Sequence, residues 1–158
     1  MSALPDLLER FRRGAELLSV ATTGASNPEL DHVPAPGRWS ARQIAAHLAD
    51  SECVGAMRIR QVIAEDNPTI VAWDEKAWAE RLNHRTRKIS QIVESFRRVR
   101  ADNYELLKDL PEQTFARTGV HTARGPLSLL DLLRIYAEHA EGHVRQIMDA
   151  RQAYKQSR

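Results

Sequence analysis

The sequence has one cysteine, Cys53, among its 158 residues, so no disulfide can form within the chain. This cysteine content suits a reducing compartment, and we expect a cytoplasmic protein. No stretch is long and apolar enough to cross a membrane, so no membrane association is expected. The N-terminal stretch MSALPDLLERFRRG lacks both an uninterrupted apolar core and a small-residue cleavage site, and a secretory signal is therefore not expected.

A strong excess of charge of one sign is also missing. The 23 Lys and Arg residues nearly balance the 21 Asp and Glu residues, which leaves a net charge of +2. The basic runs RTRK and FRRVR suggest a nucleic-acid partner, but Arg97, Arg98 and Arg100 flank apolar positions of a helix and are expected on its solvated face. Because no groove-reading motif is present either, we expect no nucleic-acid partner.

Helical periodicity, by contrast, is abundant. Apolar residues recur at spacings of three and four in four segments: about 4–21, 44–62, 89–110 and 129–147. The third segment is the most regular, and its one polar member, Asn103, is expected to be a hydrogen-bonded core residue. No segment alternates with the period of two that a strand shows. We therefore predict one all-α domain over residues 1–158, folded as a four-helix bundle.

Two capping boxes mark the starts of the second and fourth helices. Ser40 precedes Gln43 by three residues, and Ser128 precedes Asp131 in the same way. In each pair the two side chains can satisfy free backbone N–H groups at the helix start. Three long connections join the helices, at roughly 22–39, 64–86 and 111–127. The middle connection contains WDEKAWAERL, which is predicted to form a short helix.

Histidines are the residues that point to chemistry. His139 and His143 lie four residues apart on the flank of the apolar sector of the fourth helix, so both rings can reach one ion. His47 lies beside the apolar stripe of the second helix. Each of these positions alone is compatible with a structural histidine. Together they match the way in which metal sites are built in helical bundles, and three imidazoles leave at least one coordination position open.

Other polar residues fit such a site less well. Glu141 lies about 200° around the helix from His139, so it faces away and cannot act as the base that HExxH zinc proteases use. Cys53 is expected to be a packed thiol and a poor ligand. Asp50 and Ser51 could orient an imidazole or a water, although solvent exposure is favoured for Asp50. Three further histidines are expected at the surface and away from the ion: His32, His84 and His121.

The stretches RWSARQIAAHLADSE and RGPLSLLDLLRIYAEHAEGHVRQI resemble the DinB/YfiT-like metal-binding superfamily, and the likeness extends over nearly the whole chain. In that family a W-S opening and an H-L-A-D/E stretch supply one histidine, and a final H-x-x-x-H supplies two more. The resemblance implies an up-down-down-up bundle and a homodimer. It also implies a divalent ion, often nickel or zinc, held by His47, His139 and His143.

The resemblance leaves the reaction open. Some relatives are thiol S-transferases or mycothiol-dependent isomerases, and others are described as metal-dependent hydrolases. We expect a metal-dependent enzyme that transfers a small thiol to an electrophile, because a metal-bound thiol is deprotonated without a base. The alternatives are a metal-dependent hydrolase and a non-catalytic metal-binding stress protein. No catalytic residue can be assigned, and the tryptophans are expected to be packed rather than to line an entrance: Trp39, Trp73 and Trp78.

Overall fold

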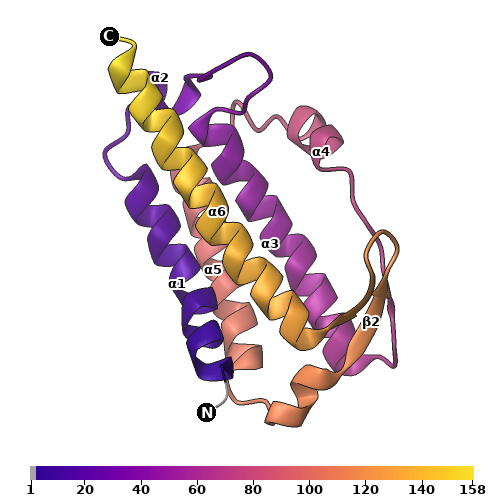
Figure 1. Ribbon diagram of the computed structural model, residues 1–158. Helices are drawn as coiled ribbons and strands as arrows, with labels where there is room; N and C mark the ends of the chain where they lie inside the picture. Colours follow the sequence, from indigo (N-terminus) through magenta and orange to yellow (C-terminus); the bar gives the residue numbers. More distant parts are fainter. Residues whose placement is uncertain (1–2) are drawn as a thin grey trace.

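Four long helices form the body of the computed structural model, which describes residues 3–158. They are α1 (Leu4–Thr22), α3 (Ala41–Ala64), α5 (Ile89–Leu107) and α6 (Leu129–Gln156). Figure 1 shows α1 rising from the N-terminal end, α3 and α5 running back down, and α6 rising to the C-terminus. The predicted up-down-down-up four-helix bundle is therefore confirmed.

The first and last long helices, α1 and α6, contact each other, and each packs on a different member of the middle pair. The closest pairings are α1 with α5 and α6, and α3 with the same two helices. Because α3 and α5 run in the same direction, residues 65–88 cross back along the whole bundle and carry α4 (Glu75–Arg81), the predicted short helix, beside α3 (Figure 1). Two further short helices were not predicted: α2 (Asn27–Asp31) and the 3-10 helix η1 (Glu112–Ala116).

Both predicted capping boxes are present. The Ser40 and Gln43 side chains each accept a hydrogen bond from the other residue's backbone N–H, at 3.3 and 3.0 Å. Ser128 and Asp131 make the same exchange at 3.0 and 2.8 Å. These bonds satisfy N–H groups that have no partner within the helix. They also fix where α3 and α6 begin, and therefore which residues each helix turns toward the interior.

A small three-stranded sheet lies at one side of the bundle, and the expectation that the chain contains no strands is wrong. Its strands are β1 (Thr69–Ile70), β2 (Thr118–His121) and β3 (Gly125–Ser128), in the order β1-β2-β3. Strand β1 is parallel to β2, and β2 and β3 form an antiparallel hairpin. Strands of two to four residues are too short to show an alternating pattern in the sequence. The turn ends at Gly125, whose φ of +76° is accessible to glycine at little cost.

A buried ion pair crosses the middle of the bundle. Arg100 is only 1% exposed, so its predicted place on the solvated face is wrong. Its guanidinium donates to both carboxylate oxygens of Glu52, at 2.7 and 2.8 Å. It also donates to the backbone carbonyls of Phe11 and Tyr136, at 2.6 and 3.1 Å. Asn103, a core residue as predicted, donates to Glu52 at 3.1 Å. One charged network thus joins all four long helices.

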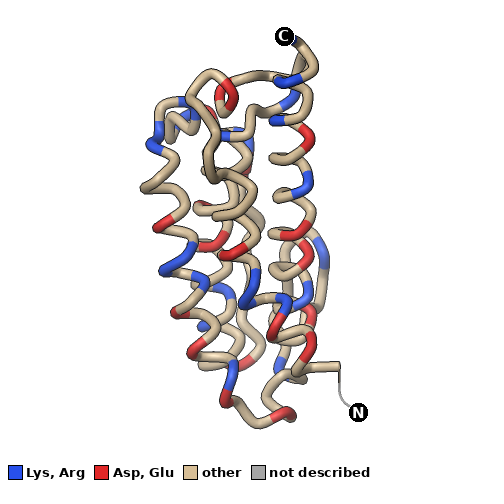
Figure 2. The backbone as a smooth tube through the Cα atoms, turned by 90° about the vertical axis from the view of Figure 1, so that its left-hand side faces the viewer, with Lys and Arg blue, Asp and Glu red and all other residues tan. Residues whose placement is uncertain are grey.

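Charges on the outer faces of the helices are mixed. Figure 2 shows Lys and Arg alternating with Asp and Glu along the bundle. Arg97 and Arg98 belong to this solvated face, as predicted, and both donate to Glu94 one turn earlier. No helix in the described part of the chain is long and apolar enough to cross a membrane.

Replacing Glu52 with alanine should destabilise the fold strongly, because it leaves the Arg100 guanidinium buried without a counter-charge. We expect the free energy of unfolding to fall by about 3–5 kcal/mol, measured by urea denaturation at pH 7. The matched control is Glu94→Ala, which breaks an exposed pair and should leave the free energy of unfolding almost unchanged. Equal losses in the two variants would contradict the role given to the buried pair.

Candidate metal centre

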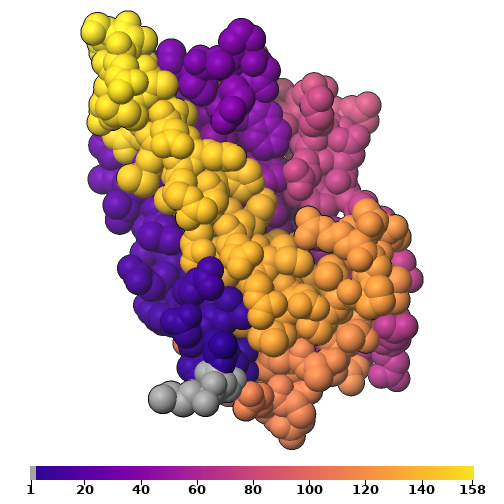
Figure 3. All heavy atoms as spheres, in the orientation of Figure 1, coloured from indigo at the N-terminus to yellow at the C-terminus, as the bar shows by residue number. Residues whose placement is uncertain are grey.

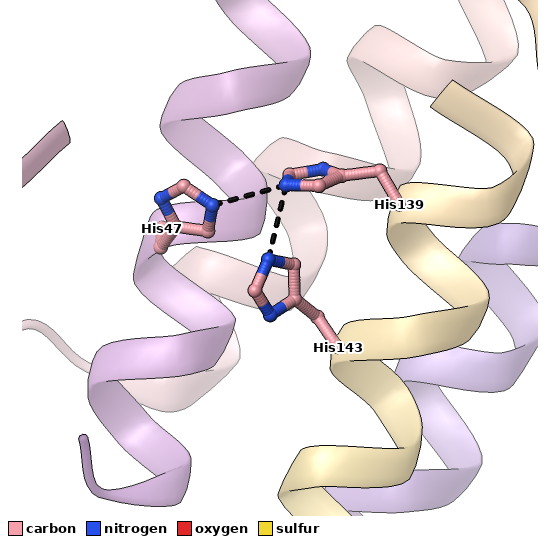
Figure 4. Close-up of side chains that lie close together, drawn as sticks. All are labelled: His47, His139 and His143. Atoms are coloured by element: carbon pink, nitrogen blue, oxygen red, sulfur yellow. Dashed lines mark hydrogen bonds between the residues drawn. The ribbon is translucent and has the colours of Figure 1, made fainter. Parts of the chain in front are cut away.

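The three predicted ligand residues meet between α3 and α6. Figure 4 shows His47 reaching across from α3 toward His139 and His143, which lie one turn apart on α6. The Nε2 atom of His139 is 3.1 Å from Nε2 of His47 and 3.0 Å from Nε2 of His143. An ion held tetrahedrally at about 2.0–2.1 Å would place neighbouring ligand nitrogens roughly 3.4 Å apart. These two separations are within a few tenths of an ångström of that value, and all three ligand atoms lie within 4.8 Å of one another, so modest side-chain shifts would let the cluster hold a metal ion.

The hydrogen bonds of His143 set its tautomer. Its Nδ1 lies 2.8 Å from the side-chain oxygen of Gln146. Because an amide oxygen can only accept, Nδ1 carries the proton and Nε2 presents its lone pair to the centre of the cluster. An outer hydrogen-bond acceptor of this kind typically orients a metal-ligating imidazole. The donor chemistry of this residue therefore fits a divalent ion.

Aromatic contacts hold His47 in place instead. Its Nδ1 is buried and has no hydrogen-bond partner among the described residues. The ring stacks on Trp73, with ring centroids 5.7 Å apart and planes 11° apart. The ring of Trp39 also packs against it, with a centroid distance of 5.1 Å. Trp78 packs edge-on against Trp73 at 4.7 Å. The expectation that the tryptophans would be packed and would line no entrance is wrong for two of them, because Trp39 and Trp73 are only half-buried and each lines a cavity beside the cluster.

Burial keeps these histidines neutral. It lowers the pKa of His47 to about 4 and that of His139 to about 3, and the neighbouring imidazoles add to both shifts. Burial also lowers the pKa of His143, against opposing effects of Gln146 and of the negative charge of Glu75. A metal-ligating histidine must be neutral, so the cluster needs no deprotonation at pH 7 before it can bind an ion.

Cavities approach the cluster from two sides. The first, here called the hairpin cavity, measures about 170 Å³ and is bounded by α3, α6, the segment around Trp73 and the β2–β3 hairpin. Its polar lining consists of Ser51, Arg58, Glu75, His121, Arg124, Tyr136 and His139. The second measures about 680 Å³ and is lined by Trp39, Lys76, His143 and Gln146 among others. In the space-filling view the hairpin and α4 both lie to one side of α6 (Figure 3).

Comparison with known proteins identifies the family. The model of the DinB superfamily matches residues 10–147. The chain belongs to the DinB superfamily.

Named relatives align with most of the length of this DinB-superfamily chain. A protein of Oceanobacillus iheyensis named "Putative metal-dependent hydrolase" is 33% identical over 131 residues, which cover 83% of this chain and 76% of the relative. YfiT of Bacillus subtilis, which has the same description, is 29% identical over 133 residues, covering 84% and 75%. The solved structure of YfiT superimposes with a TM-score of 0.90 at 25% identity, covering 96% of this chain and 89% of YfiT. It is described as "a probable metal-dependent hydrolase with an unusual four-helix bundle topology".

Among the remaining histidines of this DinB-superfamily protein, His84 departs most from expectation. It is fully buried, and its Nε2 lies 2.6 Å from a carboxylate oxygen of Asp50. The other oxygen of Asp50 accepts from Arg87 at 2.9 Å. The expectations of a surface histidine and a solvated aspartate are therefore both wrong. These bonds attach the segment that follows α4 to the side of α3.

Two further predictions are wrong: the surface position of His121 and the packing of Cys53. His121 is 7% exposed, because its Nδ1 accepts the backbone N–H groups of Ala123 and Arg124 at the hairpin turn. Cys53, expected to be packed, is exposed. His32 is half-buried against Tyr154. Among the described residues, none of these three belongs to the metal-ligand cluster.

Two glutamates differ in whether they face the site. Glu141 is bonded to Arg10 of α1 at 2.8 and 3.0 Å, so it faces away from the cluster as predicted. Glu75, which was not singled out from the sequence, lines the hairpin cavity together with His139. It begins α4, and helical periodicity cannot place a short helix in a long connection relative to the bundle. The acidic first turn of WDEKAWAERL was the only signal available.

Single alanine substitutions at His47, His139 or His143 should abolish binding of a divalent ion. With two imidazoles left, we expect wild type to retain about one zinc or nickel ion per chain after desalting and each variant less than roughly a tenth of that. Elemental analysis measures the ratio. Folded variants with alanine at His32, His84 or His121 serve as controls and should bind as wild type does. Loss of metal from one of these controls would overturn the ligand assignment.

The metal-free protein should lose stability as the pH falls from about 6.5 to 4. In this range the unfolded chain protonates His47 and His139 near their ordinary pKa of 6.5, whereas the folded protein does not, since its values are about 4 and about 3. The unfolded state therefore binds more protons, and the free energy of unfolding decreases with falling pH. Urea midpoints across the range measure this slope, which should be shallower in His139→Gln. Identical slopes would contradict the burial argument.

Proposed function

We propose that this protein is a metal-dependent hydrolase of a small molecule, with a nickel or zinc ion held by His47, His139 and His143. The observation that carries the proposal is the convergence of three imidazole nitrogens, one from each histidine, within 4.8 Å of one another beside a cavity. The names of the relatives support the same reaction class. A divalent ion bound there would lower the pKa of a water or a thiol at its open position.

The groups around the cluster divide the remaining tasks. Trp39 and Trp73 shield His47 from bulk water, and Gln146 orients His143. Glu75 supplies a carboxylate on the wall of the hairpin cavity, where it makes no hydrogen bond or ion pair with the described residues. A carboxylate free of such partners can accept a proton from a nucleophile in the cavity, which is the role of a general base.

Glu75 changes the order of the two leading hypotheses. From the sequence, thiol transfer came first because no base for water was evident. A carboxylate beside the cluster removes that objection, and hydrolysis becomes the main proposal. Thiol transfer stays as the second, because a transferase must bind two substrates and the cluster has a cavity on each side. The larger one, about 680 Å³, is within the range of small-molecule sites.

Removing the carboxylate of Glu75 should slow hydrolysis without removing the metal. We expect Glu75→Gln, loaded with zinc or nickel, to hydrolyse a chromogenic acyl ester about 10²–10⁴-fold more slowly than wild type. Glu80→Gln is the matched control, since this exposed glutamate lies on the same helix but lines a different cavity. Initial rates and metal content are measured on the same samples.

A second assay separates the two reactions. Conjugation of a small thiol to a chromogenic electrophile is followed with the same variants, and it should be insensitive to Glu75→Gln if it occurs at all. Hydrolysis at one rate in wild type, Glu75→Gln and His47→Ala would reject the hydrolase. Conjugation that depends on His47, without hydrolysis, would establish thiol transfer in its place.

A further inference from the structure

The lining of the hairpin cavity is rich in positively charged and neutral donors. Arg58 from α3 and Arg124 from the hairpin are its two cations, and Glu75 is its one acidic residue. Because the β2–β3 hairpin contacts both α3 and α6, it forms a wall over the space between them (Figure 1). The hydroxyl of Tyr136 and the imidazole of His121 lie on the same surface.

Arg58 has a donor without a partner. Its terminal nitrogens donate to the backbone carbonyl of Val71 at 2.9 Å and to the hydroxyl of Tyr136 at 3.2 Å. These two bonds fix the plane of the guanidinium. Its Nε–H, however, is buried and has no acceptor among the described residues. This Nε–H is therefore closed to a ligand as well as to water. Each terminal nitrogen, however, carries a second N–H beyond the bond it makes, and these remain for an acceptor in the cavity.

The hairpin turn positions the second arginine. His121 accepts the backbone N–H groups of Ala123 and Arg124 at its Nδ1, at 3.0 and 3.1 Å. Its proton must therefore lie on Nε2, which makes the ring a neutral donor. Burial and the charges of Arg58 and Arg124 lower the pKa of His121, so it remains neutral. The Arg124 guanidinium makes no hydrogen bond or ion pair within the described chain, so its donors are available.

We infer that the hairpin cavity binds the carboxylate of a small organic acid whose reacting group lies beside His139. Arg58 and Arg124 supply two positive charges against the single negative charge of Glu75, and the planar guanidinium matches a carboxylate. A volume of about 170 Å³ is small for a ligand site, and it suits a short carboxylate arm. This inference rests on the proposed metal site and adds the substrate class.

The test uses the cobalt(II)-substituted protein and small thiols that differ in charge. A thiol that ligates cobalt produces an absorption change that reports its dissociation constant directly, independently of turnover. The probes are 3-mercaptopropionate, neutral 2-mercaptoethanol and cationic cysteamine. We expect 3-mercaptopropionate to bind at least about ten-fold more tightly than 2-mercaptoethanol, and cysteamine to bind most weakly, because the arginines favour the anion.

Arginine variants identify the source of this preference. Arg124→Gln and Arg58→Lys, which keeps the charge but loses the planar fork, should each reduce the preference to less than about three-fold. The control is Arg134→Gln, an exposed residue on α6 that pairs with Asp131 and should leave the preference unchanged. If Arg58→Lys alters the cobalt spectrum before thiol is added, this substitution has changed the geometry of the metal site. The carboxylate site is then judged from Arg124→Gln alone.

The outcomes separate this inference from the proposed function. Cobalt binding with equal affinity for the anionic and the neutral thiol would overturn the carboxylate site and leave the metal centre intact. A preference that persists in both arginine variants would overturn it equally. If cobalt does not bind to wild type, and the wild-type spectrum is the same as that of the His47→Ala variant, the metal centre itself is overturned and the inference with it.

Discussion

The buried pair of Arg100 and Glu52 is the constraint on which the geometry of the site depends. Arg100 bonds to Glu52 of α3, five residues after His47, and to the carbonyl of Tyr136 of α6, three residues before His139. Sliding α6 along α3 would break these bonds and leave a charge unpaired in the core, which is strongly unfavourable. The pair therefore fixes the relative height at which His47 meets His139.

Two glycines permit this close packing. A Cβ atom at Gly14 would lie 2.6 Å from a guanidinium nitrogen of Arg100, and one at Gly55 would lie 2.7 Å from the ring of Tyr136. Neither distance is compatible with a methyl group unless the neighbour moves. The absence of a side chain at these positions thus lets α1 approach the arginine and α3 approach α6, which brings the ligand-bearing faces together.

Helical periodicity and capping predicted four helices with His47, His139 and His143 on their inward flanks, because both patterns are local properties of a helix. The helix order in space and the shared ion came from the family resemblance. Periodicity and capping were not enough for features that depend on contacts between distant segments. Arg100 and Arg97 look alike in the sequence, yet only Arg100 meets a carboxylate from another helix. His84 is buried for the same reason, since its partner Asp50 belongs to α3. The strands and Glu75 lie in connections, whose placement no periodicity specifies.

The parallel course of α3 and α5 has a consequence for the order in which the chain can assemble. As a result α1 packs mainly on α5 and α6 and not on α3, the next long helix in the sequence, and α6 also provides two of the three imidazoles. During synthesis on the ribosome, α1 and α3 must therefore wait, with apolar faces incompletely covered, until nearly the entire chain has emerged. Contacts between such distant segments slow folding and leave the nascent chain open to aggregation. Chaperone protection would matter most in that interval.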